Sequence, residues 1–255
     1  MSGEVIDILR GAAEAPGRLE LWERVFRRMP ARNVCEIGVY RGRFAEHVLR
    51  GCPEIESYLL VDPWRRLPDW NKPANRDDAE FREIFEEAMA RTEPFSSKRV
   101  VLRDATIVAS DRIADGSLDA IYIDGDHTLR GVAIDLIRML PKARTGGIIA
   151  GDDFTKNVWQ HGVRYSPTEV FPFAVYFAEA TGRPIVTLPH DQFCIVNEPE
   201  RGFEVIDLGG YGGLEPREIY APPRWSELRA VRGALWRRLP ARLRGKLRSI
   251  LRRSP

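Results

Sequence analysis

The chain has 255 residues, 44% hydrophobic and 30% charged, so it can bury a sizeable core, and disorder throughout is excluded. No window approaches the roughly 18 continuous apolar residues of a membrane span, and the charged N-terminus lacks the apolar stretch of a secretory signal. The formal net charge of +2 is unevenly distributed, because residues 224–255 carry +10 (eleven Lys and Arg, one acid) and the rest of the chain carries −8.

From residue 33 onward, short apolar runs alternate with helical patterns. Apolar residues at 3-4 spacing predict helices over 42–51, from 77 onward, over 128–140 and over 167–180. Seven apolar runs predict strands: 33–38, 57–62, 98–102, 118–124, 146–151, 184–188 and 192–196. Strands this short and continuously apolar, separated by helices, are typical of a parallel sheet covered on both faces. The last two runs are close enough to pair as an antiparallel hairpin.

The sequence therefore predicts an α/β fold with a mostly parallel seven-stranded sheet, helices on both faces and a C-terminal hairpin. We divide the chain into a helical N-terminal segment (1–32), the sheet domain (33–200), a Gly/Pro-rich linker (201–223) and a basic tail (224–255). The cysteines are an odd count without CxxC spacing (Cys35, Cys52 and Cys194). This pattern favours a reduced, cytoplasmic protein without a disulfide framework or zinc ribbon.

Acidic residues stand at or near the end of each of the first five predicted strands, where an open parallel sheet binds its ligands. They are Glu36, Asp62, Asp104, Asp124, Asp152 and Asp153. Because so many carboxylates on one edge would repel each other, we expect cationic or hydroxyl-bearing ligands there. Asp62 ends the second strand, where an acid can accept both hydroxyls of a ribose.

The turn after the first strand contains Gly38 and Gly42, which allow a tight bend and a close backbone approach. It is not a GxGxxG loop, because Tyr40 and Arg43 occupy positions where small residues are needed. A dinucleotide pyrophosphate is therefore disfavoured at this helix N-terminus. An ordinary strand–helix turn is the alternative for the loop taken alone.

Five motifs extend these observations: CEIGVYRG at 35–42, VDPW at 61–64, RDAT at 103–106, YIDGDH at 122–127 and GGIIAGDDF at 146–154. In them the chain resembles the Rossmann-like class I S-adenosylmethionine-dependent methyltransferases. It is most similar to the metal-dependent O-methyltransferases that act on sugars of macrolide and aminocoumarin antibiotics, a macrocin O-methyltransferase-like family. The resemblance implies that Glu36, Gly38 and Tyr40 contact the methionine part of the cofactor, that Asp62 binds its ribose, and that Asp104 and Ala105 lie near its adenine. Tyr40 departs from the pattern, since many relatives have a small residue there.

Asp124, Asp152 and Asp153 are the candidate metal ligands, because carboxylate oxygens from adjacent strand ends suit Mg²⁺ or another divalent cation. Such an ion would lower the pKa of an acceptor hydroxyl and hold it in line with the methyl group. The alternative is structural, with Asp152 capping the following loop and Asp153 solvated.

His127, three residues after Asp124, is the candidate base that takes the hydroxyl proton, and the resemblance implies the same role. His161, in the loop after the acidic pair, is the rival base. A surface histidine near a helix start is the alternative reading of His127. The loop 63–76 is a candidate lid, whose Trp64 and Trp70 either stack on a ligand or pack in the core.

We therefore predict an S-adenosylmethionine- and Mg²⁺-dependent O-methyltransferase acting on a sugar or glycoconjugate. A catechol or phenolic acceptor is one alternative, and a non-catalytic nucleotide- or RNA-binding module that uses the basic tail is another. Leucines at helical spacing among the arginines of 224–255 favour peripheral contact with an anionic membrane at its inner face over nucleic acid. A solvated tail or a helix docked on the acidic body is the alternative, and the relatives suggest a homo-oligomer.

Overall fold

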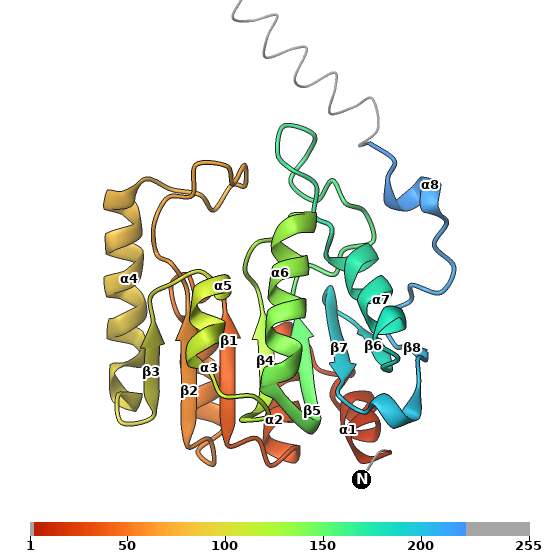
Figure 1. Ribbon diagram of the computed structural model, residues 1–255, viewed down its shortest axis with the longest axis horizontal. Helices are drawn as coiled ribbons and strands as arrows, with labels where there is room; N and C mark the ends of the chain where they lie inside the picture. The colour runs from red at the N-terminus through yellow and green to blue at the C-terminus, as the bar shows by residue number, and fades with distance from the viewer. Residues whose placement is uncertain (1–2, 223–255) are drawn as a thin grey trace, which may run out of the picture.

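The computed structural model describes residues 3–222, in which eight strands form one sheet in the order β3-β2-β1-β4-β5-β7-β6-β8 (Figure 1). The strands are β1 (Asn33–Ile37), β2 (Ser57–Val61), β3 (Arg99–Leu102), β4 (Leu118–Ile123), β5 (Ala143–Gly151), β6 (Ile185–Leu188), β7 (Gln192–Val196) and β8 (Val205–Asp207). Strands β1 to β5 pair in parallel, and β7 runs antiparallel to both β5 and β6. The predicted hairpin is therefore confirmed.

The sheet has eight strands rather than the predicted seven, because β8 pairs in parallel with β6. It lies inside the stretch 201–223 that we predicted to be a linker. Only Ile206 of its three residues is buried, so the apolar signal in the sequence is too short to predict a strand. Its position depends on the free edge of β6, which accepts it. The predicted basic tail, 224–255, lies outside the described residues.

Helices cover both faces of the sheet, and each face has its own hydrophobic core. One core packs against α1 (Glu4–Ala12), α2 (Arg18–Arg28), α3 (Arg43–Gly51) and α4 (Asp78–Thr92). The other packs against α5 (Thr106–Ala109), α6 (Leu129–Met139) and α7 (Val170–Ala180), while the short α8 (Pro216–Ile219) follows β8. Because strand side chains alternate between faces, Tyr122 of β4 stacks on Phe44 with ring centroids 3.8 Å apart, whereas its neighbours Ile121 and Ile123 enter the second core.

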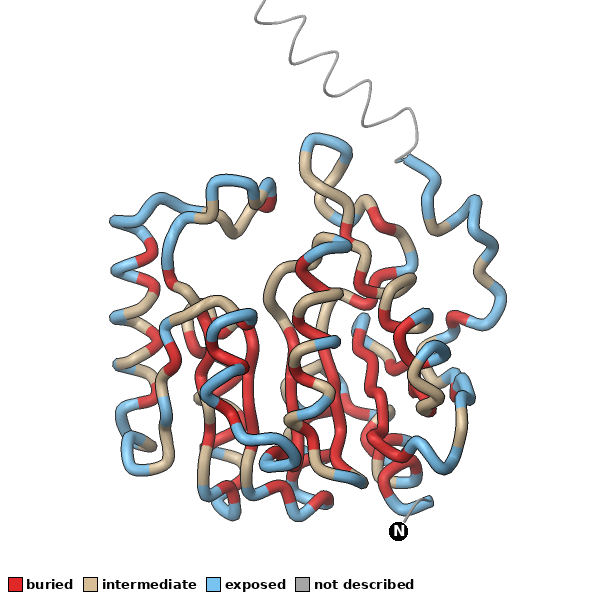
Figure 2. Tube along the Cα trace, viewed as in Figure 1, coloured by how far each residue is buried: buried red, intermediate tan, exposed pale blue. Residues whose placement is uncertain are grey.

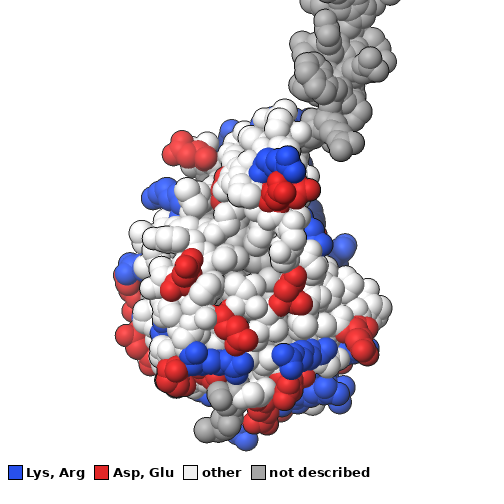
Figure 3. Space-filling view, turned by 90° about the vertical axis from the view of Figure 1, so that its right-hand side faces the viewer, with Lys and Arg blue, Asp and Glu red and all other residues white. Residues whose placement is uncertain are grey.

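Figure 2 shows that the central strands are buried along most of their length, while much of the chain in the loops beyond their carboxyl ends is exposed or half-buried. On the face seen in Figure 3, Lys and Arg are interspersed with Asp and Glu and form no patch of a single sign. Within residues 3–222, no helix combines the length and the apolar character that crossing a membrane requires. Because open parallel sheets bind their ligands beyond the carboxyl ends of the strands, we expect a functional site in the loops there.

Candidate functional site

The ends of β1 and β4 approach each other so closely at Gly38 that only glycine fits. Gly38 has φ +85°, and an added Cβ would lie 2.0 Å from the backbone oxygen of Asp124. Gly42, at φ +72°, immediately precedes α3, and a Cβ there would lie 3.1 Å from Ala88. The predicted need for a tight turn and a close approach is confirmed at Gly38. This contact places the first loop directly beside the acidic end of β4.

The Asp62 carboxylate holds the first loop by backbone hydrogen bonds. One oxygen accepts from the N–H groups of Val39 (3.0 Å) and Tyr40 (2.9 Å), and the other accepts from Trp64 (2.7 Å). Burial raises the pKa of Asp62 above its usual range, although these N–H groups oppose the shift. Asp62 therefore lies beside the glycine turn and fixes its shape, and its role as a ribose ligand stays a prediction.

Glu36 lies beneath the turn and does not reach its surface. It is 1% exposed, the Tyr58 hydroxyl donates to it at 2.8 Å, and burial raises its pKa well above the usual range. Asp104 is by contrast exposed, pairs with Arg112 at 3.1 Å and precedes Ala105 at the start of α5. The predicted row of acids therefore divides into a buried, an exposed and a clustered part.

The third part is a cluster in which His127 lies together with Asp124, Asp152 and Asp153. His127 Nδ1 lies 2.5 Å from an oxygen of Asp153, and its Nε2 lies 3.4 Å from an oxygen of Asp124. Asp153 has φ +56°, an uncommon backbone conformation for a residue other than glycine. Burial lowers the pKa of His127, but the Asp153 and Asp124 carboxylates outweigh it and raise that pKa to about 10. In this arrangement His127 carries a proton at neutral pH.

Arg18, from the N-terminal segment, belongs to the same cluster although the sequence analysis did not select it. Its Nη1 lies 3.1 Å from Asp124 and also contacts Asp152. Gln192 of β7 donates to Asp152 and accepts from Trp22 Nε1 at 2.7 Å, which fixes α2 against the sheet. The N-terminal helices are thus part of the site. The only signal in the sequence was an arginine at the start of an amphipathic helix, which is common.

The three acids fit a divalent cation by the chemistry of their donors. Arg18 bridges Asp124 and Asp152, so these two carboxylates already share one positive charge. Among the described residues, the ligand atoms that converge belong to a different set, His127, Asp153 and His161, and all lie within 4.8 Å of one another, whereas Asp124 and Asp152 are not part of it. This set contains two imidazoles and suits a transition metal better than Mg²⁺. Burial lowers the pKa of His161, which favours its neutral form.

The predicted lid is joined to the loop after β5. Lys72 Nζ donates to Thr168 Oγ1 (3.0 Å), Thr168 Oγ1 donates to Gln160 (3.1 Å), and Gln160 donates to Asp153 (2.6 Å). Trp64 packs in the core, where it is 1% exposed and donates to the Tyr40 carbonyl. Trp70 is half-buried in the lid. The candidate lid, residues 63–76, is thus connected through hydrogen bonds to the acidic cluster.

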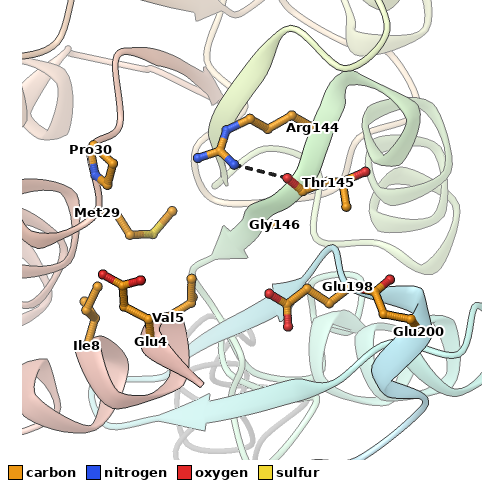
Figure 4. Close-up of a pocket in the computed structure, with 10 residues that line it drawn as sticks. All are labelled: Glu4, Val5, Ile8, Met29, Pro30, Arg144, Thr145, Gly146, Glu198 and Glu200. Carbon is orange, nitrogen blue, oxygen red and sulfur yellow. Dashed lines mark hydrogen bonds between the residues drawn. The ribbon is translucent and has the colours of Figure 1, made fainter. Parts of the chain in front are cut away.

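A separate cavity of about 260 Å³ lies at the opposite end of the sheet (Figure 4). It is lined by α1, by the start of β5 and by the segment after β7, and the close-up shows Glu198 pointing toward its centre. Three glutamates and apolar side chains line it, and none of the predicted site residues is among them. The residues with catalytic chemistry therefore gather at the carboxyl ends of the strands.

The chain resembles known proteins in part of its sequence and in its fold. Residues 35–154, which contain all the motifs above, match a family described as a methyltransferase domain. A candidate caffeoyl-CoA O-methyltransferase from Staphylococcus aureus superposes with a TM-score of 0.54 at 15% identity, over 75% of this chain and 91% of that one. An O-methyltransferase from Bacillus cereus, solved in complex with SAH, superposes with a TM-score of 0.50 at 14% identity, over 76% and 90%. No curated protein matches the sequence.

The predicted α/β Rossmann-like methyltransferase fold is thereby confirmed, since likeness at such low identity is a likeness of fold. The family match and the fold together support an S-adenosylmethionine-dependent methyltransferase.

Proposed function

We propose that the protein transfers a methyl group from S-adenosylmethionine to a hydroxyl of a sugar or glycoconjugate. The observation that carries the proposal is the placement of His127 between Asp124 and Asp153, with the backbone of Asp124 lying against the Gly38 turn. A histidine held between two carboxylates is a suitable group to take the proton of a hydroxyl, and a binding module has no need of one. The names of the two superposed structures, both O-methyltransferases, support an oxygen acceptor.

Each residue has a role in this proposal. The turn at Gly38 and Tyr40, held by Asp62, forms the surface for the cofactor, with Asp104 and Ala105 assigned to its adenine. Asp124 and Asp153 orient the imidazole of His127. The negative charges of Asp124 and Asp153 keep His127 protonated as long as these carboxylates bind no other cation. His127 therefore becomes a base only when such a cation engages them.

We further propose that Asp124, Asp152 and Asp153 hold Mg²⁺ or another divalent cation, with displacement of Arg18. Such a cation would take up their negative charge, lower the pKa of an acceptor hydroxyl and orient it. His127 and Asp124 then remain the catalytic pair. The second candidate acceptor is a catechol or other phenol. Two neighbouring oxygens of a catechol, like those of a sugar, could complete the coordination of a cation held by the same three carboxylates. The name of the S. aureus protein supports this alternative.

The first test is a thermal-shift comparison of the whole chain with S-adenosylmethionine and with NAD, each with and without Mg²⁺. We expect S-adenosylmethionine to stabilise the protein and Mg²⁺ to add to that effect. Stabilisation by NAD alone would refute the proposed activity. Transfer of labelled methyl groups to a panel of sugars and catechols then identifies the acceptor class.

Two matched variants, His127→Ala and His161→Ala, decide which histidine is the base. We expect His127→Ala to lower turnover by at least about 100-fold, the usual contribution of a general base, with cofactor and metal binding unchanged. His161→Ala should retain turnover within a few-fold. The opposite pattern would transfer the role to His161.

We keep, as a proposal, peripheral binding of residues 224–255 to an anionic membrane, since leucine stripes among arginines suit a lipid surface. Liposomes that contain anionic lipid should pellet the protein at low salt and release it at high salt. Failure to pellet at low salt rejects it.

A further inference from the structure

A cavity of about 450 Å³ lies in the loop 63–76 that we predicted to be a lid, and most of the charged residues in its lining are cations. Three cations, Arg66, Lys72 and Arg76, line it with a single acid, Asp77. Trp70 and Tyr165 add two aromatic rings. The cavity is thus formed by the segment 66–77 together with one residue of the loop after β5, and its side chains are those that recognise an anion joined to a flat or ring-shaped group.

The two arginines are free to bind a ligand. Within residues 3–222, neither Arg66 nor Arg76 forms an ion pair, whereas Arg91, on the adjoining helix α4, pairs with both Glu46 and Glu87. The acid in the lining is already engaged, because an oxygen of Asp77 accepts from the N–H groups of Ala79 and Glu80 at the start of α4. The positive charge of the cavity is therefore not compensated by its own lining.

The cavity wall is held in place before any ligand binds. The Asn75 amide donates to the carbonyls of Leu67 (2.8 Å) and Trp70 (2.7 Å), which closes the loop on itself. Asn71 accepts from the N–H of Ser166 at 3.1 Å and so joins the loop that carries Tyr165. Trp70 Nε1 is buried and has no acceptor among the described residues, so one donor in this wall lacks a partner.

The same wall leads to the acidic cluster. Lys72 is 5% exposed and is the first member of the hydrogen-bond series through Thr168 and Gln160 to Asp153. The wall of the cavity is therefore linked to Asp153, one of the residues that we assign to methyl transfer, by three successive hydrogen bonds. The anionic part of a molecule bound in the cavity would face the arginines, and the remainder could extend toward His127.

We propose that this cavity binds a phosphoryl group of the acceptor, so that the sugar is methylated as its phosphate or diphosphate ester. The methylation of a hydroxyl of this acceptor rests on the proposed function. The binding of the phosphoryl group in the cavity does not. Phosphoryl oxygens match the chemistry of the lining, because a guanidinium can donate two parallel hydrogen bonds to such a group and Arg66 and Arg76 provide two guanidinium groups. Trp70 and Tyr165 provide faces for the sugar or for a nucleotide base.

The test is calorimetric titration of the whole protein with inorganic pyrophosphate, UDP and glucose 1-phosphate. The variants are Arg66→Ala, Arg76→Ala and the double variant, and Arg65→Ala is the matched control, since Arg65 is exposed and does not line the cavity. We expect each single variant to weaken pyrophosphate binding about 3- to 10-fold and the double variant at least 10-fold. Arg65→Ala should stay within twofold. Thermal unfolding confirms that the variants are folded.

Two outcomes overturn the proposal: pyrophosphate fails to bind the wild-type protein, or the double variant binds it as tightly as wild type does. UDP binding at least tenfold tighter than that of the other two probes identifies a nucleotide-linked sugar, and comparable binding of all three identifies a simple sugar phosphate. Titration with S-adenosylmethionine in the same samples separates this proposal from the proposed function. If the wild-type protein binds pyrophosphate but not S-adenosylmethionine, the methyltransferase is refuted. If it binds S-adenosylmethionine but not pyrophosphate, only the phosphoryl site is refuted.

Discussion

Arg18 offers the sharpest test of how the acidic cluster is stabilised. Arg18→Gln removes the guanidinium that bridges Asp124 and Asp152 and leaves two carboxylates without their shared cation. The Arg18 side chain is 38% exposed and that of Asp152 is 13% exposed, so the cost lies between that of a surface pair, about 0–1 kcal/mol, and that of a buried pair, about 3–5 kcal/mol. We expect a loss of about 2 kcal/mol in the free energy of unfolding, or about 4–8 °C in Tm for a domain of this size.

The assay is urea and thermal unfolding in the presence of a chelator, with Arg24→Gln as the control, because Arg24 lies exposed on the same helix. Arg18→Lys should recover part of the lost stability, since it restores the charge. Adding Mg²⁺ should stabilise Arg18→Gln more than wild type, because the variant leaves the carboxylates free to bind it. If Arg18→Gln and Arg24→Gln unfold within about 1 °C of each other, the bridging role is wrong.

Two further predictions concern single residues. Gly38→Ala combines a positive φ with a 2.0 Å contact to the backbone of Asp124, so we expect it to cost about 3 kcal/mol or more by urea denaturation. Gly116→Ala, also at positive φ but with nothing within 4 Å, should cost only about 1 kcal/mol, and equal losses would refute the contact. Burial raises the pKa of Asp135 from 3.8 to about 7, so the stability that its protonated form contributes is fully present below pH 3.8 and is lost as the pH rises from 3.8 through 7. Asp135→Asn should therefore stabilise the protein progressively between pH 4 and 8, by at most about 4 kcal/mol, and a pH-independent difference would contradict this account.

The parallel core of the fold was predictable because each of its strands is a continuous apolar run, and the acids at the strand ends were predictable from the rule that such ends converge. What the sequence could not provide was the direction of each carboxylate. Glu36 enters the core because Tyr58 of the neighbouring strand donates to it. Asp62 accepts from backbone N–H groups whose positions depend on the turn at Gly38. Contacts of this kind are decided by pairing between strands, and no local pattern encodes them.

Arg18 and β8 could not be predicted from the sequence for a related reason. Arg18 lies 106 residues from Asp124 in the chain, and it reaches the site only because Trp22 fixes α2 through Gln192 of β7. The three residues of β8 form a strand because the edge of β6 is available to them. Both depend on partners distant in sequence, whereas the composition of residues 63–76 predicted a loop but not its hydrogen-bonded connection to Asp153.

The charges of the two neighbouring regions imply an orientation for an anionic acceptor. In the acidic cluster, three carboxylates face one guanidinium and one imidazolium, so a negative charge remains there. In the lid cavity, three cations face one acid. A phosphoryl group is therefore repelled by the cluster and attracted by the cavity, whereas a neutral hydroxyl can enter the cluster freely. On the proposed function, this difference directs the hydroxyl of a phosphorylated sugar toward His127 and its phosphate toward Arg66 and Arg76. The charge pattern itself thus selects which end of the acceptor is methylated.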